Sequence, residues 1–156
     1  IEVALKLREL QIPSIPVNFY IPLEGAPLKE TIDPFETLSP EYCLRILCLV
    51  RLLNPSAEIR MAAGREIHLR SLQVMGLYPA NSLFMDGYLN TQGTNLVETL
   101  TMIKDGGFTI KSDKALDNLL AAAEINMKLN DTESSSDHSP VFKDREMLRP
   151  ELSLSE

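Results

Sequence analysis

The hydrophobic pattern of the chain changes its period several times between residue 1 and about residue 130. Short apolar runs, bounded by proline, glycine or asparagine, alternate with longer segments in which apolar residues recur every three or four positions. The first pattern is typical of buried strands and the second of amphipathic helices. We therefore predict strands at 15–22, 58–62 and 80–85, and helices at 1–10, 39–53, 64–76, 95–105 and 113–129.

The helix predicted at 39–53 has the clearest end signals. Ser39 followed by Pro40 is a typical helix start, because serine caps the first turn and proline fits the first helical position. Asn54 and Pro55 end the same segment. We expect its buried stripe to consist of Cys43, Ile46, Leu47, Val50 and Leu53.

The order of these elements predicts an α/β fold. Strands that alternate with helices of this length form βα units, which assemble into a parallel sheet. About three parallel strands cannot close a barrel, so we expect either the C-terminal portion of a TIM-type barrel or part of an open, doubly wound sheet. In both folds, ligands bind at the carboxyl ends of the strands.

Composition narrows the classes of partner. Hydrophobic residues make up 44% of the chain and charged residues 24%, as in an ordinary globular protein. The net charge of −7 argues against nucleic acid or an anionic membrane as a partner, and no apolar run approaches the roughly 20 residues of a membrane span. The two cysteines, Cys43 and Cys48, are interpreted as small, unpaired core residues, which indicates a reducing, cytoplasmic compartment.

The two ends of the chain differ from its middle. Residues 1–10 have helical composition from the first residue, with Val3, Leu7 and Leu10 on one expected face, and no initiator methionine precedes them. We therefore expect a fragment of a longer protein. Residues 130–156 carry seven acidic residues, three basic residues and six serines, a composition typical of disorder. We divide the chain into a folded part, 1–129, and a disordered tail, 130–156.

Three polar side chains interrupt the predicted strands. Arg60 lies between Ile59 and Met61, and a buried cation is costly unless an anion or another ligand receives it. Asn18 is the polar residue of the first strand, and it either satisfies backbone groups at the strand end or points into a ligand pocket. Ser82 is the polar candidate of the third strand, where a structural role is the simpler interpretation.

Seven short blocks follow one another along the chain. They are IPVNF at 15–19, LEGAPL at 23–28, RLLNP at 51–55, EIRMAAGRE at 58–66, LRSLQ at 69–73, GLYPANSLF at 76–84 and GYLNTQG at 87–93. In this order they resemble the C-terminal part of the biotin synthase family and, more loosely, the thiamin-synthesis radical enzymes. The resemblance covers about residues 1–110, and it depends on the order of the blocks rather than on any single motif.

This resemblance implies a radical S-adenosylmethionine enzyme on a TIM-type barrel, usually a homodimer, that inserts sulfur into dethiobiotin. In the family, a 4Fe–4S cluster cleaves S-adenosylmethionine to a radical that abstracts hydrogen from dethiobiotin, and a 2Fe–2S cluster supplies the sulfur. The resemblance makes Arg60 a ligand of the 2Fe–2S cluster and puts Ser82 near it. It puts Asn18 at the ureido ring of dethiobiotin, Ile21 against the adenine of S-adenosylmethionine, and Arg65 in an ion pair without a direct role.

The chain also departs from the family pattern. The Cys-x3-Cys-x2-Cys motif that binds the 4Fe–4S cluster is absent from these residues, as are the cysteine ligands of the 2Fe–2S cluster, and we assign no catalytic residue. An N-terminal part of the barrel would have to supply them. Two alternatives stay open, namely a stand-alone, non-catalytic binding domain derived from the barrel, and another radical S-adenosylmethionine enzyme of the thiamin and biotin group. For Arg60, the alternative is a purely structural ion pair.

Overall fold

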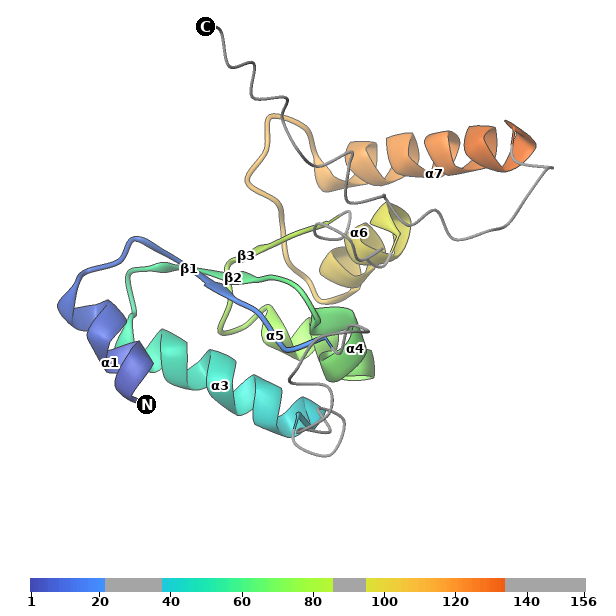
Figure 1. Ribbon diagram of the computed structural model, residues 1–156. Coiled ribbons are helices and arrows are strands. Elements are labelled where there is room, and N and C mark those ends of the chain that lie inside the picture. The colour runs from blue at the N-terminus through green and yellow to red at the C-terminus, as the bar shows by residue number, and fades with distance from the viewer. Residues whose placement is uncertain (22–37, 86–94, 134–156) are drawn as a thin grey trace, which may run out of the picture.

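Helices and a short parallel sheet alternate along the chain (Figure 1). The computed structural model describes residues 1–21, 38–85 and 95–133. The elements are α1 (Glu2–Glu9), β1 (Ser14–Val17), α3 (Pro40–Leu53), β2 (Glu58–Met61), α4 (Arg65–Leu69), the 3-10 helix η2 (Arg70–Leu72), α5 (Gln73–Gly76), β3 (Ser82–Leu83), α6 (Leu96–Asp105) and α7 (Leu116–Glu133). The sequence blocks at 23–28 and 87–93 lie outside the described residues. So does the part of the predicted 130–156 tail from residue 134 onward, whereas residues 130–133 belong to α7.

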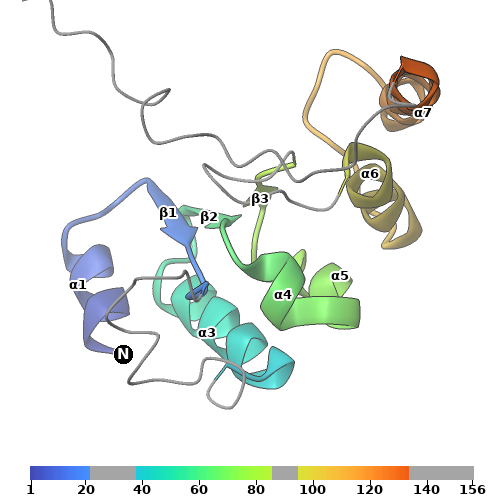
Figure 2. The ribbon, with the colours of Figure 1, turned by 45° about the vertical axis from the view of Figure 1, so that its right-hand side comes forward.

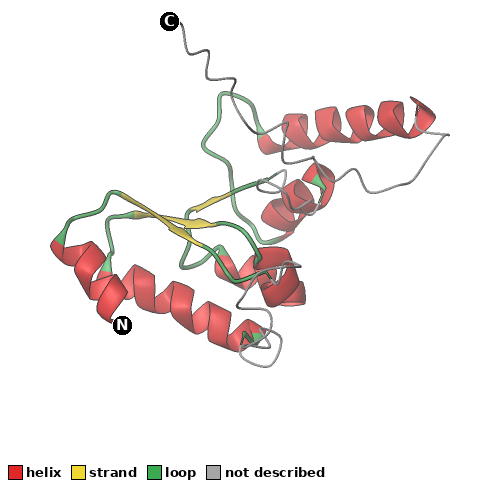
Figure 3. Ribbon diagram, in the orientation of Figure 1, coloured by secondary structure: helices red, strands yellow, loops and turns green. Residues whose placement is uncertain are grey.

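The strands form one parallel sheet in the order β1–β2–β3 (Figure 3). Arg60 in the central strand pairs with Pro16 on one side and with Ser82 on the other. Pairing extends past the end of β1, because the Phe19 N–H donates to the Ala63 carbonyl oxygen at 2.9 Å. Strands in chain order with helical connections are the arrangement of a segment of a TIM-type barrel, so the predicted α/β fold is confirmed.

The helices α1, α3, α4 and α5 lie on one side of the sheet (Figure 2). Odd-numbered residues of β1 and β2 are part of the core shared with these helices, and the alternation of a strand turns the even-numbered residues to the opposite face. The sheet therefore has one apolar, covered face and one face away from the helices. The core consists of Ala4, Ile15, Phe19, Cys43, Leu47, Val50, Ala57, Ile59, Met61, Leu69 and Ala80.

Helix α3 begins and ends where the sequence predicts. The Ser39 hydroxyl accepts a hydrogen bond from the Tyr42 N–H at 3.2 Å, and Pro40 occupies the first helical position. At the other end, the buried side chain of Asn54 donates to the Ala4 carbonyl oxygen at 3.2 Å. Asn54 therefore both ends α3 and joins it to α1.

The buried faces of two helices differ from the prediction. At α1, Val3 is 73% exposed and Leu10 is 58% exposed, whereas Ala4 is buried. The small Ala4 side chain allows α1 to pack against α3, so the neighbouring helix determines the buried face. In α3, Cys43 is buried but Cys48 is exposed. The interpretation of Cys48 as a core residue is wrong, because a separation of five positions turns it away from the face that contains Cys43.

Several element boundaries also differ from the prediction. The segment at 64–76 is not one helix but α4, η2 and α5, because Arg70 has a φ of 51° and interrupts the helical backbone. The third strand is shorter than the predicted 80–85, since the Ala80 N–H still bonds to the Gly76 carbonyl oxygen at the end of α5. Helix α7 continues to Glu133, beyond the predicted end at 129.

Helices α6 and α7 pack against each other beside the sheet (Figure 1). The Asn95 side chain caps α6 by accepting from the Glu98 N–H at 3.0 Å. An ion pair of 2.8 Å between Lys104 and Asp117 joins the two helices. Among the helices of the described ranges, none is long and apolar enough to cross a lipid bilayer.

Candidate functional site

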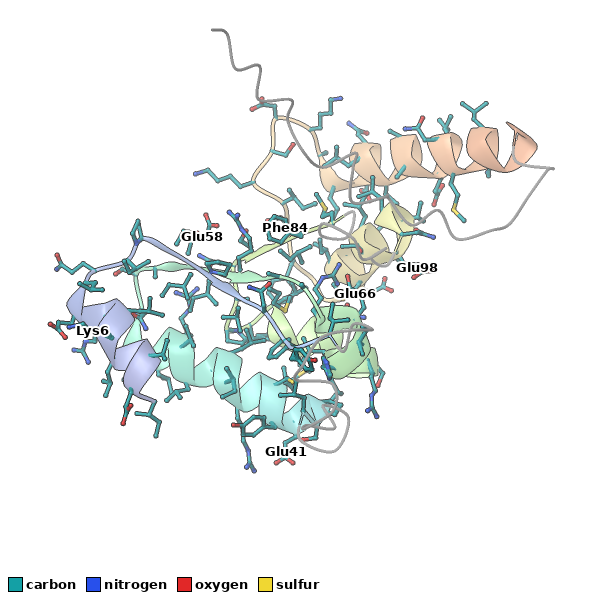
Figure 4. The ribbon with its side chains drawn as sticks, viewed as in Figure 1. Lys6, Glu41, Glu58, Glu66, Phe84 and Glu98 are labelled. Atoms are coloured by element: carbon teal, nitrogen blue, oxygen red, sulfur yellow. The ribbon has the colours of Figure 1, made fainter. Side chains whose placement is uncertain are left out.

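Polar side chains gather on the face of the sheet away from the helices. Figure 4 shows Glu58 and Phe84 on the side of the sheet opposite α3. The paired even positions of the strands add Ser14, Arg60 and Ser82 to this face. In a TIM-type barrel, the face opposite the helices is the barrel interior. The polar set therefore lies on the face that a barrel would turn to its interior.

Arg60 is at the centre of this face. Its Nε donates to the Ser82 hydroxyl at 2.9 Å, and its Nη2 forms an ion pair with the Glu58 carboxylate. The guanidinium carbon lies 5.2 Å from the centroid of the Phe84 ring, within the range of a cation–π interaction. The side chain is 34% exposed. Arg60 is therefore not a cation enclosed in the apolar core, because its even position turns it away from the helices.

Glu58 connects Arg60 to the first strand. The Ser14 hydroxyl donates to Oε1 of Glu58 at 3.3 Å, so side-chain contacts run across all three strands from Ser14 to Ser82. Within the part of the chain that the structure describes, Nη1 of Arg60 makes no hydrogen bond. A cavity of about 590 Å³, lined in part by Glu58 and Ser82, lies beside β3. Arg60 does not line this cavity, which therefore adjoins its two partners rather than Nη1 itself.

Asn18 lies just beyond the carboxyl end of β1. Its Oδ1 accepts from the Ala63 N–H at 3.2 Å, so the side chain satisfies a backbone group at the strand end. Its Nδ2 forms no hydrogen bond with any described residue, and the side chain is exposed. An amide in this position combines a structural contact with two free donors. Those donors lie at the edge of the sheet where βα folds bind ligands.

The segment that follows Asn18 is held by His68. His68 is fully buried in α4, and its Nε2 lies 2.7 Å from the Tyr20 carbonyl oxygen. Its ring also meets the Phe19 ring edge-on, with the centroids 6.4 Å apart. Ile21 comes directly after these two anchored residues and is partly buried. No pattern of residues connects His68 with this edge, because α4 contacts the segment only in the folded chain.

Arg65 is a buried cation, with only 1% of its surface exposed. It forms an ion pair of 3.0 Å with Glu66 and donates to Gln73 at 2.5 Å and to the Phe84 carbonyl oxygen at 3.1 Å. Burial lowers the pKa of the guanidinium, and the carboxylate of Glu66 opposes that shift. The expected ion pair is confirmed. Arg65 also supports the backbone of Phe84, whose ring contacts Arg60.

The structure brings two of the predicted site residues into direct contact. Arg60 and Ser82 are hydrogen-bonded, whereas Asn18 and Ile21 lie along the extension of β1. Sequence reasoning overlooked Glu58, although an acidic residue two positions before an arginine on a strand shares its face. In the ranges 1–21, 38–85 and 95–133, no three His, Cys, Asp or Glu side chains gather to hold a metal ion.

Most of this region matches one known family. The sequence profile of the Biotin and Thiamin Synthesis associated domain matches residues 16–109, which is more than half of the chain. The chain belongs to this family. The matched range contains all four residues of the predicted site, Asn18, Ile21, Arg60 and Ser82.

Curated relatives of this family region are named biotin synthase. The chain is 48% identical over 122 residues to the biotin synthase of Acaryochloris marina, which covers 78% of the chain and 34% of that protein. It is 53% identical over 108 residues to the biotin synthase of Leptospira interrogans, which covers 69% of the chain and 30% of that protein. It is 51% identical over 111 residues to the biotin synthase of Magnetococcus marinus, which covers 71% of the chain and 33% of that protein. The chain spans about a third of the length of the curated relatives it matches.

Proposed function

We propose that the chain is the C-terminal part of a biotin synthase, which converts dethiobiotin to biotin by radical sulfur insertion. The observation that carries this proposal is the 48–53% identity to proteins named biotin synthase over most of the chain. The polar sheet face around Arg60 supports it, because the contacts lie on the interior side of a barrel segment. The same proposal includes three further points. The full-length protein completes the barrel, forms a homodimer and works in a reducing, cytoplasmic compartment.

Arg60 is the residue we assign to the 2Fe–2S cluster. Its donor set fits that role, since Ser82 and Glu58 hold two of the three guanidinium nitrogens and leave Nη1 without a hydrogen bond in the described chain. Iron binds a nitrogen lone pair, so Nη1 would have to give up one proton to hold the cluster. It would then complete a set of thiolate ligands in the way that imidazole nitrogens do in Rieske 2Fe–2S centres. When bound, the cluster supplies the sulfur for insertion. Ser82 keeps the guanidinium at the sheet, and the Phe84 ring limits its movement on one side.

Asn18 is the residue we assign to dethiobiotin. Its Nδ2 has two donors available, and the carbonyl oxygen of a cyclic urea is a matching acceptor. The hydrogen bond from the Ala63 N–H to Oδ1 holds one end of the amide, and Nδ2 has no bond to a described residue. Ile21 is assigned to the adenine of S-adenosylmethionine, as a partly buried apolar side chain on a segment that His68 anchors. The remainder of the barrel would hold the 4Fe–4S cluster and make most of the contacts to S-adenosylmethionine.

The test uses the full-length protein that the gene encodes, reconstituted with iron and sulfide in the absence of oxygen. We expect it to form biotin from dethiobiotin with S-adenosylmethionine and a one-electron reductant. We expect no biotin from the 156 residues alone, because they contain no Cys-x3-Cys-x2-Cys motif. A full-length protein that binds clusters but leaves dethiobiotin unchanged would refute the proposed reaction and favour another radical enzyme of the group.

The visible spectrum of the 2Fe–2S cluster tests the assignment of Arg60 separately from biotin formation. Arg60→Met removes the guanidinium, and we expect the visible absorption of the 2Fe–2S cluster to change more than the free energy of unfolding. Arg45→Met is the matched control, because Arg45 forms a surface ion pair with Glu41 in which both side chains are over 70% exposed. If the spectra of both variants equal that of the wild type, Arg60 has only the structural ion pair with Glu58.

A further inference from the structure

Glu58 and Arg60 form an ion pair along a single strand. They lie two positions apart on β2, so both side chains stand on the face away from the helices. Both are partly exposed, with 40% of the Glu58 side chain and 34% of the Arg60 side chain accessible. Glu58 has a second contact, from the Ser14 hydroxyl on β1. Both contacts use the same oxygen, Oε1, so Ser14 and Arg60 share one acceptor atom of the carboxylate.

A guanidinium needs two contacts in its plane to be fixed. The Nε–H bond to Ser82 fixes one direction but still lets the group swing about that contact. The Nη2 contact to Glu58 supplies the second direction, and the Phe84 ring covers one surface of the plane. Because an arginine side chain otherwise has considerable rotamer freedom, these contacts together decide where the remaining nitrogen, Nη1, points.

We propose that Glu58 is a positioning residue, which orients Arg60 so that Nη1 is presented to the 2Fe–2S cluster. This inference rests on the proposed function, since it deepens the role assigned to Arg60. A carboxylate suits the task better than a neutral acceptor, because a charge-assisted hydrogen bond to a guanidinium is shorter and stronger. Ser14 extends the same support by one strand, through its hydroxyl bond to Glu58.

The experiment compares four variants of the full-length, cluster-loaded protein. Glu58→Ala removes the contact, and Glu58→Gln keeps the size of the side chain but not its charge. Arg60→Met removes the assigned ligand, and Glu41→Ala is the control, since Glu41 forms an exposed ion pair with Arg45 on the outer helix α3. The readouts are the visible absorption and resonance Raman bands of the 2Fe–2S cluster, and the half-time of iron loss to a chelator.

We expect Glu58→Ala to shift the cluster bands and to shorten the half-time of iron loss roughly tenfold, the lower range for loss of a residue that orients a metal ligand. Glu58→Gln should fall between Glu58→Ala and the wild type, and Glu41→Ala should equal the wild type. Because Glu58→Gln is nearly isosteric, it keeps the comparison valid if Glu58→Ala folds poorly, which circular dichroism would reveal.

Two results would overturn the inference, and they are distinguishable. If Arg60→Met changes the cluster bands while both Glu58 variants equal the wild type, Arg60 is a ligand that needs no orientation by Glu58, and the proposed function survives. If Arg60→Met also leaves the bands unchanged, the assignment of Arg60 itself fails, and the positioning role fails with it.

Discussion

Gly64 faces the carbonyl oxygen of Phe19 so closely that a Cβ atom built on it would lie 2.3 Å from that oxygen. Gly64 also has a φ of 82°, in the left-handed region that favours glycine. The close approach allows the chain after β1 to run beside the turn that follows β2, where the Phe19 N–H bonds to Ala63. The position of Asn18 therefore depends on a glycine in another part of the sequence.

We predict that Gly64→Ala lowers the free energy of unfolding by about 2 kcal/mol or more, since strain and a clash with backbone add together. Gly107→Ala is the matched control, because Gly107 has a φ of 75° but no atom within 4 Å of its built Cβ. Urea unfolding of both variants measures the difference. Equal losses would mean that only the backbone conformation matters and that the Phe19 contact relaxes freely.

The parts of the fold that depend on neighbouring residues could be predicted from the sequence. The start of α3 is an example, because Ser39 caps the helix through its own N-terminal turn and Pro40 fits the first position without any distant contact. The strands around Ile15 and Ile59 were also predictable, since a buried strand of a parallel sheet is apolar on the covered face.

The parts that depend on distant contacts could not be predicted. Spacing in the first ten residues fits a face with Val3 as well as one with Ala4, and only packing against α3 selects Ala4. Arg70 has a positive φ without any glycine to signal the break between α4 and η2. In the site, the family resemblance named Arg60 and Ser82, but their contact depends on the register of β2 and β3.

The two cysteines should differ in reactivity. Cys43 is fully buried and Cys48 is exposed, so we predict that a thiol reagent at neutral pH labels Cys48 in the folded chain and reaches Cys43 only after unfolding. Mass spectrometry of labelled peptides, with Cys48→Ser as the control, measures this. Rapid labelling of Cys43 in native conditions would show that α3 does not stay packed on the sheet.

Burial also makes the contribution of Cys43 to stability depend on pH. Burial raises the pKa of its thiol above the ordinary value of 9.0, and a backbone hydrogen bond partly opposes that shift. The unfolded chain therefore loses this proton first as the pH rises above 9.0, so stability falls there by up to about 1.4 kcal/mol per pH unit. We expect Cys43→Ala to remove this part of the alkaline slope in urea unfolding, while Cys48→Ser keeps it.

Hydrogen bonds from Arg51 connect the carboxyl end of α3 to the turns before β2 and β3. Its Nε donates to the Pro79 carbonyl oxygen at 2.7 Å, its Nη1 to that of Ala57 at 2.8 Å, and its Nη2 to the Asn81 side chain at 3.0 Å. Asn81 in turn accepts from the Ile59 N–H at 2.8 Å. One side chain thus joins a helix to both strands that carry Arg60 and Ser82.

We predict that Arg51→Met lowers the free energy of unfolding by about 2–3 kcal/mol, because it leaves several partly buried carbonyl oxygens without a donor. Arg45→Met, six positions earlier on the exposed side of the same helix, removes a surface ion pair and should cost no more than about 1 kcal/mol. Urea unfolding compares the two. Similar losses would mean that water replaces the Arg51 donors, and the placement of β3 against β2 would then rest on backbone pairing and on Asn81 alone.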